Sequence, residues 1–190
     1  MAIKAIIFDC FGVLVKDSMS LFCATYLSDA PEAVAEIRRL DHLSSEGKMT
    51  WNELLDEIVR LSGVNRDEVS RVLDINPPNL PLFDYITEEL KPHYKLGFLS
   101  NAADDWLKEL FTADQLALFD DFVLSYQHSM RKPDTAIFEL AANRLGILPS
   151  ESILIDDVEV YCQGAREVGM SAVQYISPDQ TKSDIEAIVK

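Results

Sequence analysis

The apolar run near the start of the chain, residues 3–9, ends on a carboxylate, Asp9, and the chain then turns through Gly12. A near-continuous apolar run of this length is typical of a strand that is buried on both faces. In an open parallel sheet, ligands bind at the carboxyl ends of the strands. The run therefore predicts a buried strand that presents Asp9 at a binding edge, as a nucleophile, a metal ligand or only a turn former.

From residue 95 onward, apolar strand-like runs alternate with stretches of helical periodicity. Strands are expected at residues 95–100, 121–125, 152–157 and 171–176, and helices at residues 102–111, 134–145, 161–168 and 183–189. Strands that alternate with helices imply a parallel sheet with helices on both faces. The sequence therefore predicts an α/β fold.

Residues 17–90 differ from the rest, since they hold helical stretches and no convincing strand. Thr50 and Glu53 have the form of a capping box ahead of apolar residues at helical spacing. Three prolines break the pattern near its end: Pro77, Pro78 and Pro81. We therefore expect a core formed by residues 1–16 and 91–190, with residues 17–90 inserted as a helical cap after the first strand.

The composition limits the partners of the protein. Its 190 residues carry a formal net charge of −15, which repels nucleic acids and anionic membranes at long range. No segment approaches the ~20 apolar residues of a membrane span, and no signal peptide is visible. The three cysteines lack metal-site spacing and indicate reduced thiols in a cytoplasmic protein. Neither nucleic acid nor membrane is therefore expected as a partner.

Polar side chains follow several of the predicted strands or precede the next helix. In a parallel sheet these positions lie along one edge, so the side chains are expected to converge there. The converging set combines carboxylates, a hydroxyl, an amide and an ammonium group. Its members are Asp9, Ser100, Asn101, Lys132, Asp156 and Asp157.

Phosphoryl transfer would use each of these groups. A carboxylate such as Asp9 can attack phosphorus and form an aspartyl phosphate. Mg²⁺ held by Asp9 and Asp156 would neutralise the approach of two anions. Lys132 would offset the same repulsion, and Ser100 would donate a hydrogen bond to a phosphate oxygen.

Each residue also has a plain structural interpretation. Ser100 is a possible helix N-cap, and an Asp-Asp pair at a strand end can be a cap beside a surface acid. A lone lysine such as Lys132 is usually a solvated surface residue. The order of the whole set, rather than any single residue, favours a catalytic site.

Four motifs in this order resemble those of the haloacid dehalogenase-like hydrolase superfamily, and the match runs over nearly the whole chain. The resemblance implies a Rossmann-like α/β core, and the helical insert is similar to the small helical cap of the family's first type. Residues 46–54 resemble a cap segment common in its phosphatase-like branches. The motifs lie at residues 8–14, 99–101, 130–134 and 155–159, and residues 164–170 fit the family's usual continuation.

The resemblance implies a role for each candidate residue. Asp9 would be the nucleophile of a small-molecule hydrolase. Mg²⁺ would be bound by Asp9, by the backbone carbonyl of Phe11, and by Asp156 and Asp157. Ser100 and Asn101 would hold the phosphate, and Lys132 would balance charge.

Phe11 departs from the family's phosphatase pattern. Family phosphatases usually carry a second aspartate at this position, which protonates the leaving group and later activates water. General acid–base help of this kind is typically worth ~10²–10⁴ in rate. A Mg²⁺-dependent phosphatase acting on a small phosphorylated metabolite would then rely on good leaving groups, on bulk water or on another acid such as Asp17.

Other activities stay open because of Phe11. A 2-haloacid dehalogenase resembles this chain in having an aromatic residue there, needs no metal and uses a cap arginine, for which Arg38 or Arg39 are candidates. A cap lysine, Lys48, could act as in phosphonoacetaldehyde hydrolase. A degenerate member would bind a phosphorylated ligand or a partner protein without turnover. The Asp156-Asp157 pair favours the phosphatase, because a dehalogenase has no use for a magnesium site.

Overall fold

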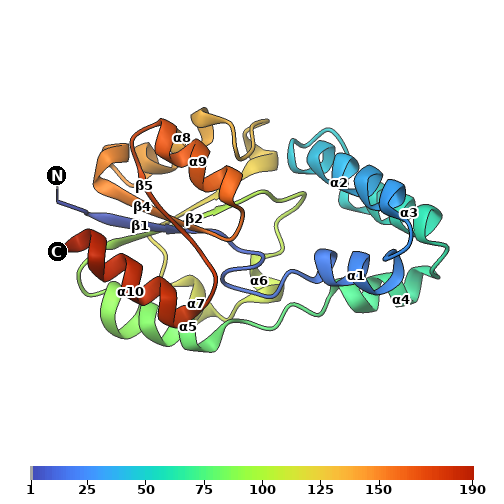
Figure 1. Cartoon of the computed structure of the whole chain (residues 1–190), viewed down its shortest axis with the longest axis horizontal. Coiled ribbons are helices and arrows are strands. Elements are labelled where there is room, and N and C mark those ends of the chain that lie inside the picture. Colours follow the sequence, from blue (N-terminus) through green and yellow to red (C-terminus); the bar gives the residue numbers. More distant parts are fainter. Residues whose placement is uncertain (1) are drawn as a thin grey trace.

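The computed structural model describes residues 2–190, and its centre is a parallel sheet of five strands (Figure 1). The strand order is β3-β2-β1-β4-β5, so the first strand of the chain lies in the middle. The α/β prediction is confirmed, and each observed strand lies within its predicted range. The strands are β1 (Ala5–Phe8), β2 (Lys95–Ser100), β3 (Asp121–Leu124), β4 (Ser152–Asp156) and β5 (Ser171–Gln174).

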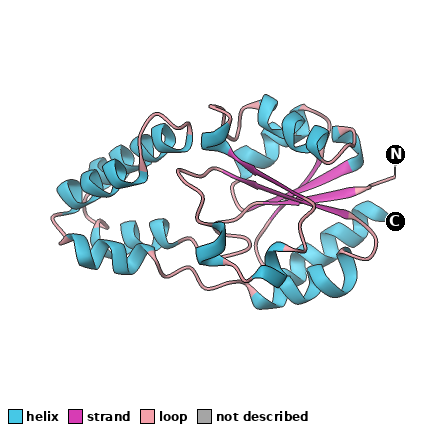
Figure 2. Cartoon of the chain, turned by 180° about the vertical axis from the view of Figure 1, so that it is seen from behind, coloured by secondary structure: helices cyan, strands magenta, loops and turns pink. Residues whose placement is uncertain are grey.

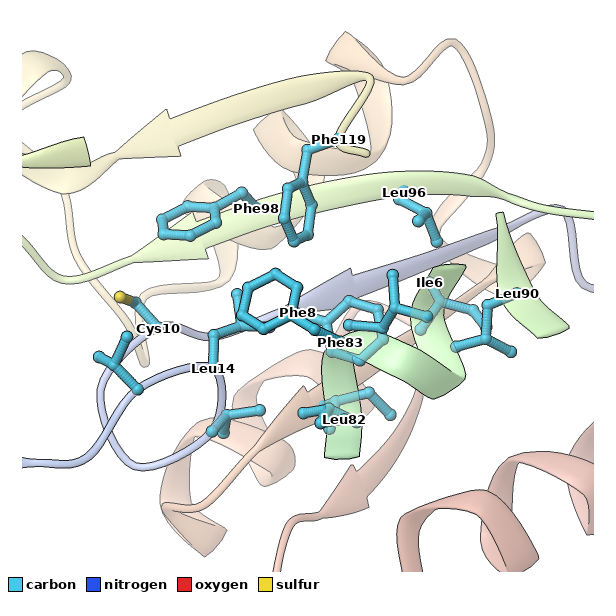
Figure 3. Packing of buried hydrophobic residues seen from close by; sticks show 14 of the residues in the cluster. Ile6, Phe8, Cys10, Leu14, Leu82, Phe83, Leu90, Leu96, Phe98 and Phe119 are labelled. Carbon is cyan, nitrogen blue, oxygen red and sulfur yellow. The ribbon is translucent and has the colours of Figure 1, made fainter. Parts of the chain in front are cut away.

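Strand β1 is buried on both faces, which explains its unbroken apolar sequence. Ile6 and Phe8 point into one apolar cluster, while Ala5 and Ile7 point into a second cluster on the opposite face. Figure 3 shows Ile6 and Phe8 packed among side chains of neighbouring elements. A strand enclosed in this way holds the following residue, Asp9, in a fixed position.

Helices cover both faces of the sheet (Figure 2). On one face lie α8 (Thr135–Arg144) and α9 (Glu159–Glu167), whose apolar residues share a cluster with Ile7. On the other face lie α5 (Leu80–Tyr85), the π-helical turn Ile86–Leu90 and α10 (Pro178–Val189). This two-sided covering is the one that the alternation of strands and helices predicts.

The four helices between β1 and α5 stand apart from the sheet (Figure 1). They pack on one another in a cluster of their own, centred on Phe22, Leu54 and Ile58. The capping box of Thr50 and Glu53 is present and opens the third helix. None of the helices within residues 2–190 is both long and apolar enough to cross a membrane. The helices are α1 (Ser18–Tyr26), α2 (Pro31–Ser45), α3 (Trp51–Ser62) and α4 (Arg66–Leu73).

The segment after the proline-rich boundary belongs by its packing to the sheet. Leu82, Phe83, Ile86 and Leu90 lie in the same cluster as Ile6, and Figure 3 shows Leu82, Phe83 and Leu90 beside β1. The helices that pack only among themselves therefore span residues 18–73. The division into core and cap stays a prediction, and this packing favours a second boundary near residue 79 instead of residue 90.

The helix predicted at residues 102–111 is wrong for most of its length. Only Leu107–Leu110 is helical (α6), and a second short helix, α7, follows at Ala113–Leu116. Asp104 and Asp105 accept hydrogen bonds from the backbone N–H groups of Asp105 and Leu107, respectively. Short acidic side chains bonded in this way compete with helix formation.

Candidate active site

Lys132 joins two of the strand ends. Its Nζ lies 2.7 Å from Oδ1 of Asp9, after β1, and 2.5 Å from Oδ2 of Asp156, at the end of β4. The side chains of Lys132 and Asp156 are fully buried, and that of Asp9 nearly so. A buried lysine flanked by two carboxylates is not the solvated surface residue of the plain interpretation.

Asp157 completes an arrangement of three carboxylates. One oxygen of each of Asp9, Asp156 and Asp157 lies within 4.8 Å of the others. Oδ1 of Asp157 is buried and has no hydrogen-bond partner among the described residues. A buried carboxylate oxygen without a partner is costly, and oxygen ligands are those that Mg²⁺ prefers. The donor set therefore fits a hard divalent cation.

Gly12 makes room for Asp157. Its φ is +88°, and a β-carbon at this position would lie 2.3 Å from Oδ2 of Asp157. Only glycine combines this backbone conformation with such a close approach. The turn after β1 is thus shaped around the acid that follows β4.

The charges in this cluster do not balance. Burial and the charge of Asp156 together raise the pKa of Asp9 to about 8, against the attraction of Lys132. Burial also raises the pKa of Asp157 to about 6, with the charge of Asp156 as the next cause. Burial alone would lower the pKa of Lys132, but the two carboxylates that it touches outweigh burial and raise it. Three ionised carboxylates against one ammonium group would leave an excess of negative charge, which adds to burial in raising the pKa values of Asp9 and Asp157, and a divalent cation would neutralise it.

Ser100 and Asn101 follow β2 and differ in what they contact. Ser100 does not cap a helix, since the next one, α6, begins at Leu107; among residues 2–190 its buried hydroxyl makes one long bond of 3.4 Å, to the carbonyl of Asn101. The Asn101 side chain donates to the carbonyl of Lys132 at 3.1 Å and accepts from its N–H at 2.8 Å. The side-chain amide of Asn101 therefore fixes the backbone of Lys132. The roles of both residues in phosphate binding stay predictions.

Phe11 packs on an aromatic neighbour and brings no acid to the site. Its ring meets that of Trp106 nearly edge-on, with the ring centres 4.8 Å apart. The backbone of Phe11 bridges to Val15 in the tight turn after Asp9. Its backbone carbonyl as a metal ligand stays a prediction.

The cap residues of the sequence-based alternatives lie in different surroundings. Asp17 caps α1 through the N–H and hydroxyl of Ser20, and its charge reaches Asp157 and raises the pKa of that carboxyl. Lys48 and Arg39 are exposed and pair with Glu46 and Glu36. Arg38 is exposed as well and lines an open surface depression of about 470 Å³ between α1 and α2, together with Leu27 and Val34.

Sequence reasoning assigned no role to Tyr161, in the first turn of α9. Nζ of Lys132 lies 5.1 Å from the centre of its ring, and the Tyr161 hydroxyl accepts a hydrogen bond from Nη2 of Arg131 at 3.2 Å. The signal that could have drawn attention to it is an aromatic residue shortly after the Asp156-Asp157 pair. Arg131 was noted only as part of the motif around Lys132.

The fold and the buried acid–lysine cluster define an α/β protein with a candidate active site at the carboxyl edge of its sheet. The family model of the haloacid dehalogenase-like hydrolases matches residues 3–169, and the chain belongs to this family. A curated relative, acyl-CoA dehydrogenase family member 10 of Mus musculus, is 32% identical over 71 residues. That stretch covers 37% of this chain but only 7% of the length of the relative.

Solved structures of the family share the fold over most of the chain. A family enzyme of Bacteroides thetaiotaomicron in complex with magnesium is 25% identical, with a TM-score of 0.71 over 92% of this chain and 94% of that one. A 2-haloacid dehalogenase of Pseudomonas syringae pv. Tomato is 21% identical, with a TM-score of 0.59 over 91% of this chain and 86% of that one. A magnesium-bound family enzyme and a 2-haloacid dehalogenase therefore both share this fold.

Proposed function

We propose that the protein is a Mg²⁺-dependent phosphatase that acts on small phosphorylated metabolites through an aspartyl phosphate on Asp9. The main support is the set of three carboxylate oxygens that lie within 4.8 Å of one another, together with the buried Oδ1 of Asp157 that has no hydrogen-bond partner among the described residues. A dehalogenase would have no use for the pair that follows β4. The similarity to a magnesium-bound family enzyme supports the same choice.

The side chains divide the first chemical step among them. An oxygen of Asp9 attacks phosphorus, the bond from phosphorus to the ester oxygen breaks, and the leaving alkoxide takes a proton from water. Lys132, in contact with Asp9, reduces the repulsion between the carboxylate and the phosphate. Ser100 would donate a hydrogen bond to a phosphate oxygen. Mg²⁺ bound by Asp9, Asp156, Asp157 and the carbonyl of Phe11 would neutralise the charge on the transferring group.

The second step returns Asp9 to its free form. Water attacks phosphorus, the acyl-phosphate bond breaks, and inorganic phosphate leaves. Phe11 can neither protonate the leaving group nor activate this water, so turnover is expected to be slow with alkyl esters. Asp17 is the candidate acid to replace the missing aspartate, and an unchanged rate of phosphate release in Asp17→Asn would exclude it from this role.

A second candidate function is hydrolytic dehalogenation of a 2-haloacid. Two observations favour it: the aromatic residue Phe11 lies two residues after Asp9, and Arg38 lines an open surface depression between α1 and α2. In this reaction Asp9 would attack carbon, and halide would leave without help from a metal.

One assay separates the candidates. The wild-type protein is incubated with phosphate esters and with 2-haloacids, each with Mg²⁺ and with a chelator, and Asp9→Asn serves as the control. Metal-dependent phosphate release supports the phosphatase, and halide release in chelator supports the dehalogenase. Turnover that survives in Asp9→Asn would sink both covalent mechanisms. Binding of a phosphorylated ligand without turnover would favour a non-enzymatic member of the family.

A further inference from the structure

Arg131 is a buried guanidinium group that contacts only neutral acceptors. The residue is 8% exposed. Its Nε donates to Oγ of Ser45 and its Nη2 donates to the hydroxyl of Tyr161, each at 3.2 Å. Among residues 2–190 no carboxylate lies within ion-pair distance of it, whereas Arg144 on the surface forms a fork with Asp121.

Such a group is costly unless an anion neutralises it. Burying a charge without an ionic partner costs far more than burying a neutral polar group. The charge of Arg131 reaches two carboxyls: it opposes the rise that burial causes in the pKa of Asp41, and it helps to lower the pKa of Glu46, which is lowered mainly by Lys48. Neither carboxyl forms an ion pair with Arg131. Nη1 and the second N–H of Nη2 have no hydrogen bond within the described part of the chain, so one end of the guanidinium fork is free for a ligand.

Arg131 is linked to the candidate site through Tyr161 and to α2 through Ser45. The ring of Tyr161 faces the ammonium of Lys132, and its hydroxyl meets Arg131. The cations of these two consecutive residues therefore contact the same tyrosine, Lys132 at its ring and Arg131 at its hydroxyl. Because Lys132 touches Asp9 and Ser45 ends α2, Arg131 faces the seam between the site and the cap.

We propose that Arg131, with the hydroxyl of Tyr161, binds a second anionic group of the substrate. The substrate class is then a small phosphate ester that also carries a carboxylate or a second phosphate. A guanidinium fork matches the geometry of both anions, and the Tyr161 hydroxyl keeps its own proton to donate to them. This inference rests on the proposed phosphatase function, since it describes the other end of the same substrate.

Matched substrates test the proposal. Phosphoglycerate and glycerol phosphate differ by a carboxylate in place of a hydroxymethyl group, and fructose bisphosphate and fructose monophosphate differ by a second phosphate. We expect kcat/KM to favour the more anionic member of one pair by about 10- to 100-fold, as for hydrogen bonds to a charged group. The pair with the larger preference identifies the anion as carboxylate or phosphate.

Substitution at Arg131 gives the decisive comparison. The quantity compared is the ratio of kcat/KM for the two members of the preferred pair. Arg131→Gln is expected to bring this ratio close to one, and Arg131→Lys to keep part of the preference. The surface control Arg144→Gln should leave the ratio unchanged. If Arg131 only fastened the cap to the core, Arg131→Gln would slow both members of a pair equally. An unchanged ratio in Arg131→Gln would overturn the proposal.

A binding measurement separates this inference from the proposed function. If no phosphate ester is hydrolysed, the phosphatase proposal fails, and Asp9→Asn is then titrated with phosphoglycerate and fructose bisphosphate in a calorimeter with Mg²⁺ present. If the double variant Asp9→Asn/Arg131→Gln binds one of the ligands at least tenfold more weakly than Asp9→Asn does, the second anion site is supported. If Asp9→Asn and the double variant bind each ligand with the same affinity, the second anion site is contradicted.

Discussion

The ring of Phe11 meets the ring of Trp106 at 4.8 Å and an interplanar angle of 68°, two residues after the candidate nucleophile. An aromatic pair of this geometry contributes about 0.5–1.5 kcal/mol beyond its buried area. The position that carries an acid in related phosphatases thus contributes packing here. Replacing Phe11 by aspartate would lose the stabilisation from this contact.

Phe11→Asp is expected to raise kcat for alkyl phosphates by about 10²-fold, because the new carboxyl can protonate a poor leaving group. The gain should be much smaller for p-nitrophenyl phosphate, whose leaving group needs no proton. Phosphate release from both ester types, with Phe11→Asn as the matched control without an acid, measures the effect. Equal rates in the two variants would show that proton transfer does not limit the wild-type protein.

The strands were predictable because the three central ones, β2, β1 and β4, are short and largely buried apolar runs, and the edge strands β3 and β5 each follow a helical stretch. β2 lies at the predicted residues 95–100, and the sheet brings Asp9 and Asp156 to one edge as the parallel arrangement requires. The helix predicted at residues 102–111 failed because Asp104 and Asp105 bond to the local backbone, a choice that periodicity does not register.

The details of the site depend on contacts between residues distant in sequence. Asn101 holds the backbone of Lys132 from 31 residues away, and Arg131 reaches Ser45, at the end of α2, from 86 residues away. Strand periodicity places residues at an edge but does not say which side chains there bond to one another. For that reason the sequence could nominate Asn101 for phosphate binding but could not show that its amide is engaged.

Lys132→Met should lower the free energy of unfolding by about 3–5 kcal/mol at pH 8, because it leaves Asp9 and Asp156 buried without their cation. Mg²⁺ should restore part of this loss by neutralising the same carboxylates. Urea unfolding with and without Mg²⁺ measures both effects, and the exposed Lys108→Met serves as the control. If the urea midpoint of Lys132→Met equalled that of Lys108→Met, the ion pairs of Lys132 would not stabilise the fold.

Asp41 predicts a dependence of stability on pH. Burial raises its pKa from 3.8 to about 6, against the attraction of Arg131, and the charge of Asp17 adds to the rise. The folded protein therefore holds this proton to a higher pH than the unfolded chain, and unfolding between these values releases it. The contribution of Asp41 to stability is thus present at low pH and falls as the pH rises to about 6.

Asp41→Asn stays neutral and should escape this loss. Its free energy of unfolding should match that of the wild type near pH 4 and exceed it near pH 7 by at most about 3 kcal/mol. Urea unfolding at the two pH values, with the exposed Asp29→Asn as the control, provides the comparison. Lower stability of Asp41→Asn near pH 7 would mean that the attraction of Arg131 outweighs the cost of burial.

Gly164, in the middle of α9, supports the residue next to the candidate catalytic lysine. A β-carbon there would lie 2.6 Å from the carbonyl oxygen of Pro133 and 2.9 Å from Cε2 of Phe138. An ordinary glycine inside a helix gains about 1 kcal/mol when it becomes alanine. Here the crowding of a backbone oxygen should reverse the sign, since overpacking costs about 1–3 kcal/mol.

We therefore expect Gly164→Ala to lower the urea midpoint and also to reduce kcat, because displacing Pro133 moves the backbone that carries Lys132 against Asp9. Gln163→Ala, an exposed change one residue earlier on the same helix, should leave both quantities nearly unchanged. A Gly164→Ala protein more stable than the wild type would show that α9 can shift away from Pro133 at no cost. In that case the close packing of this helix would not be what holds Lys132 between Asp9 and Asp156.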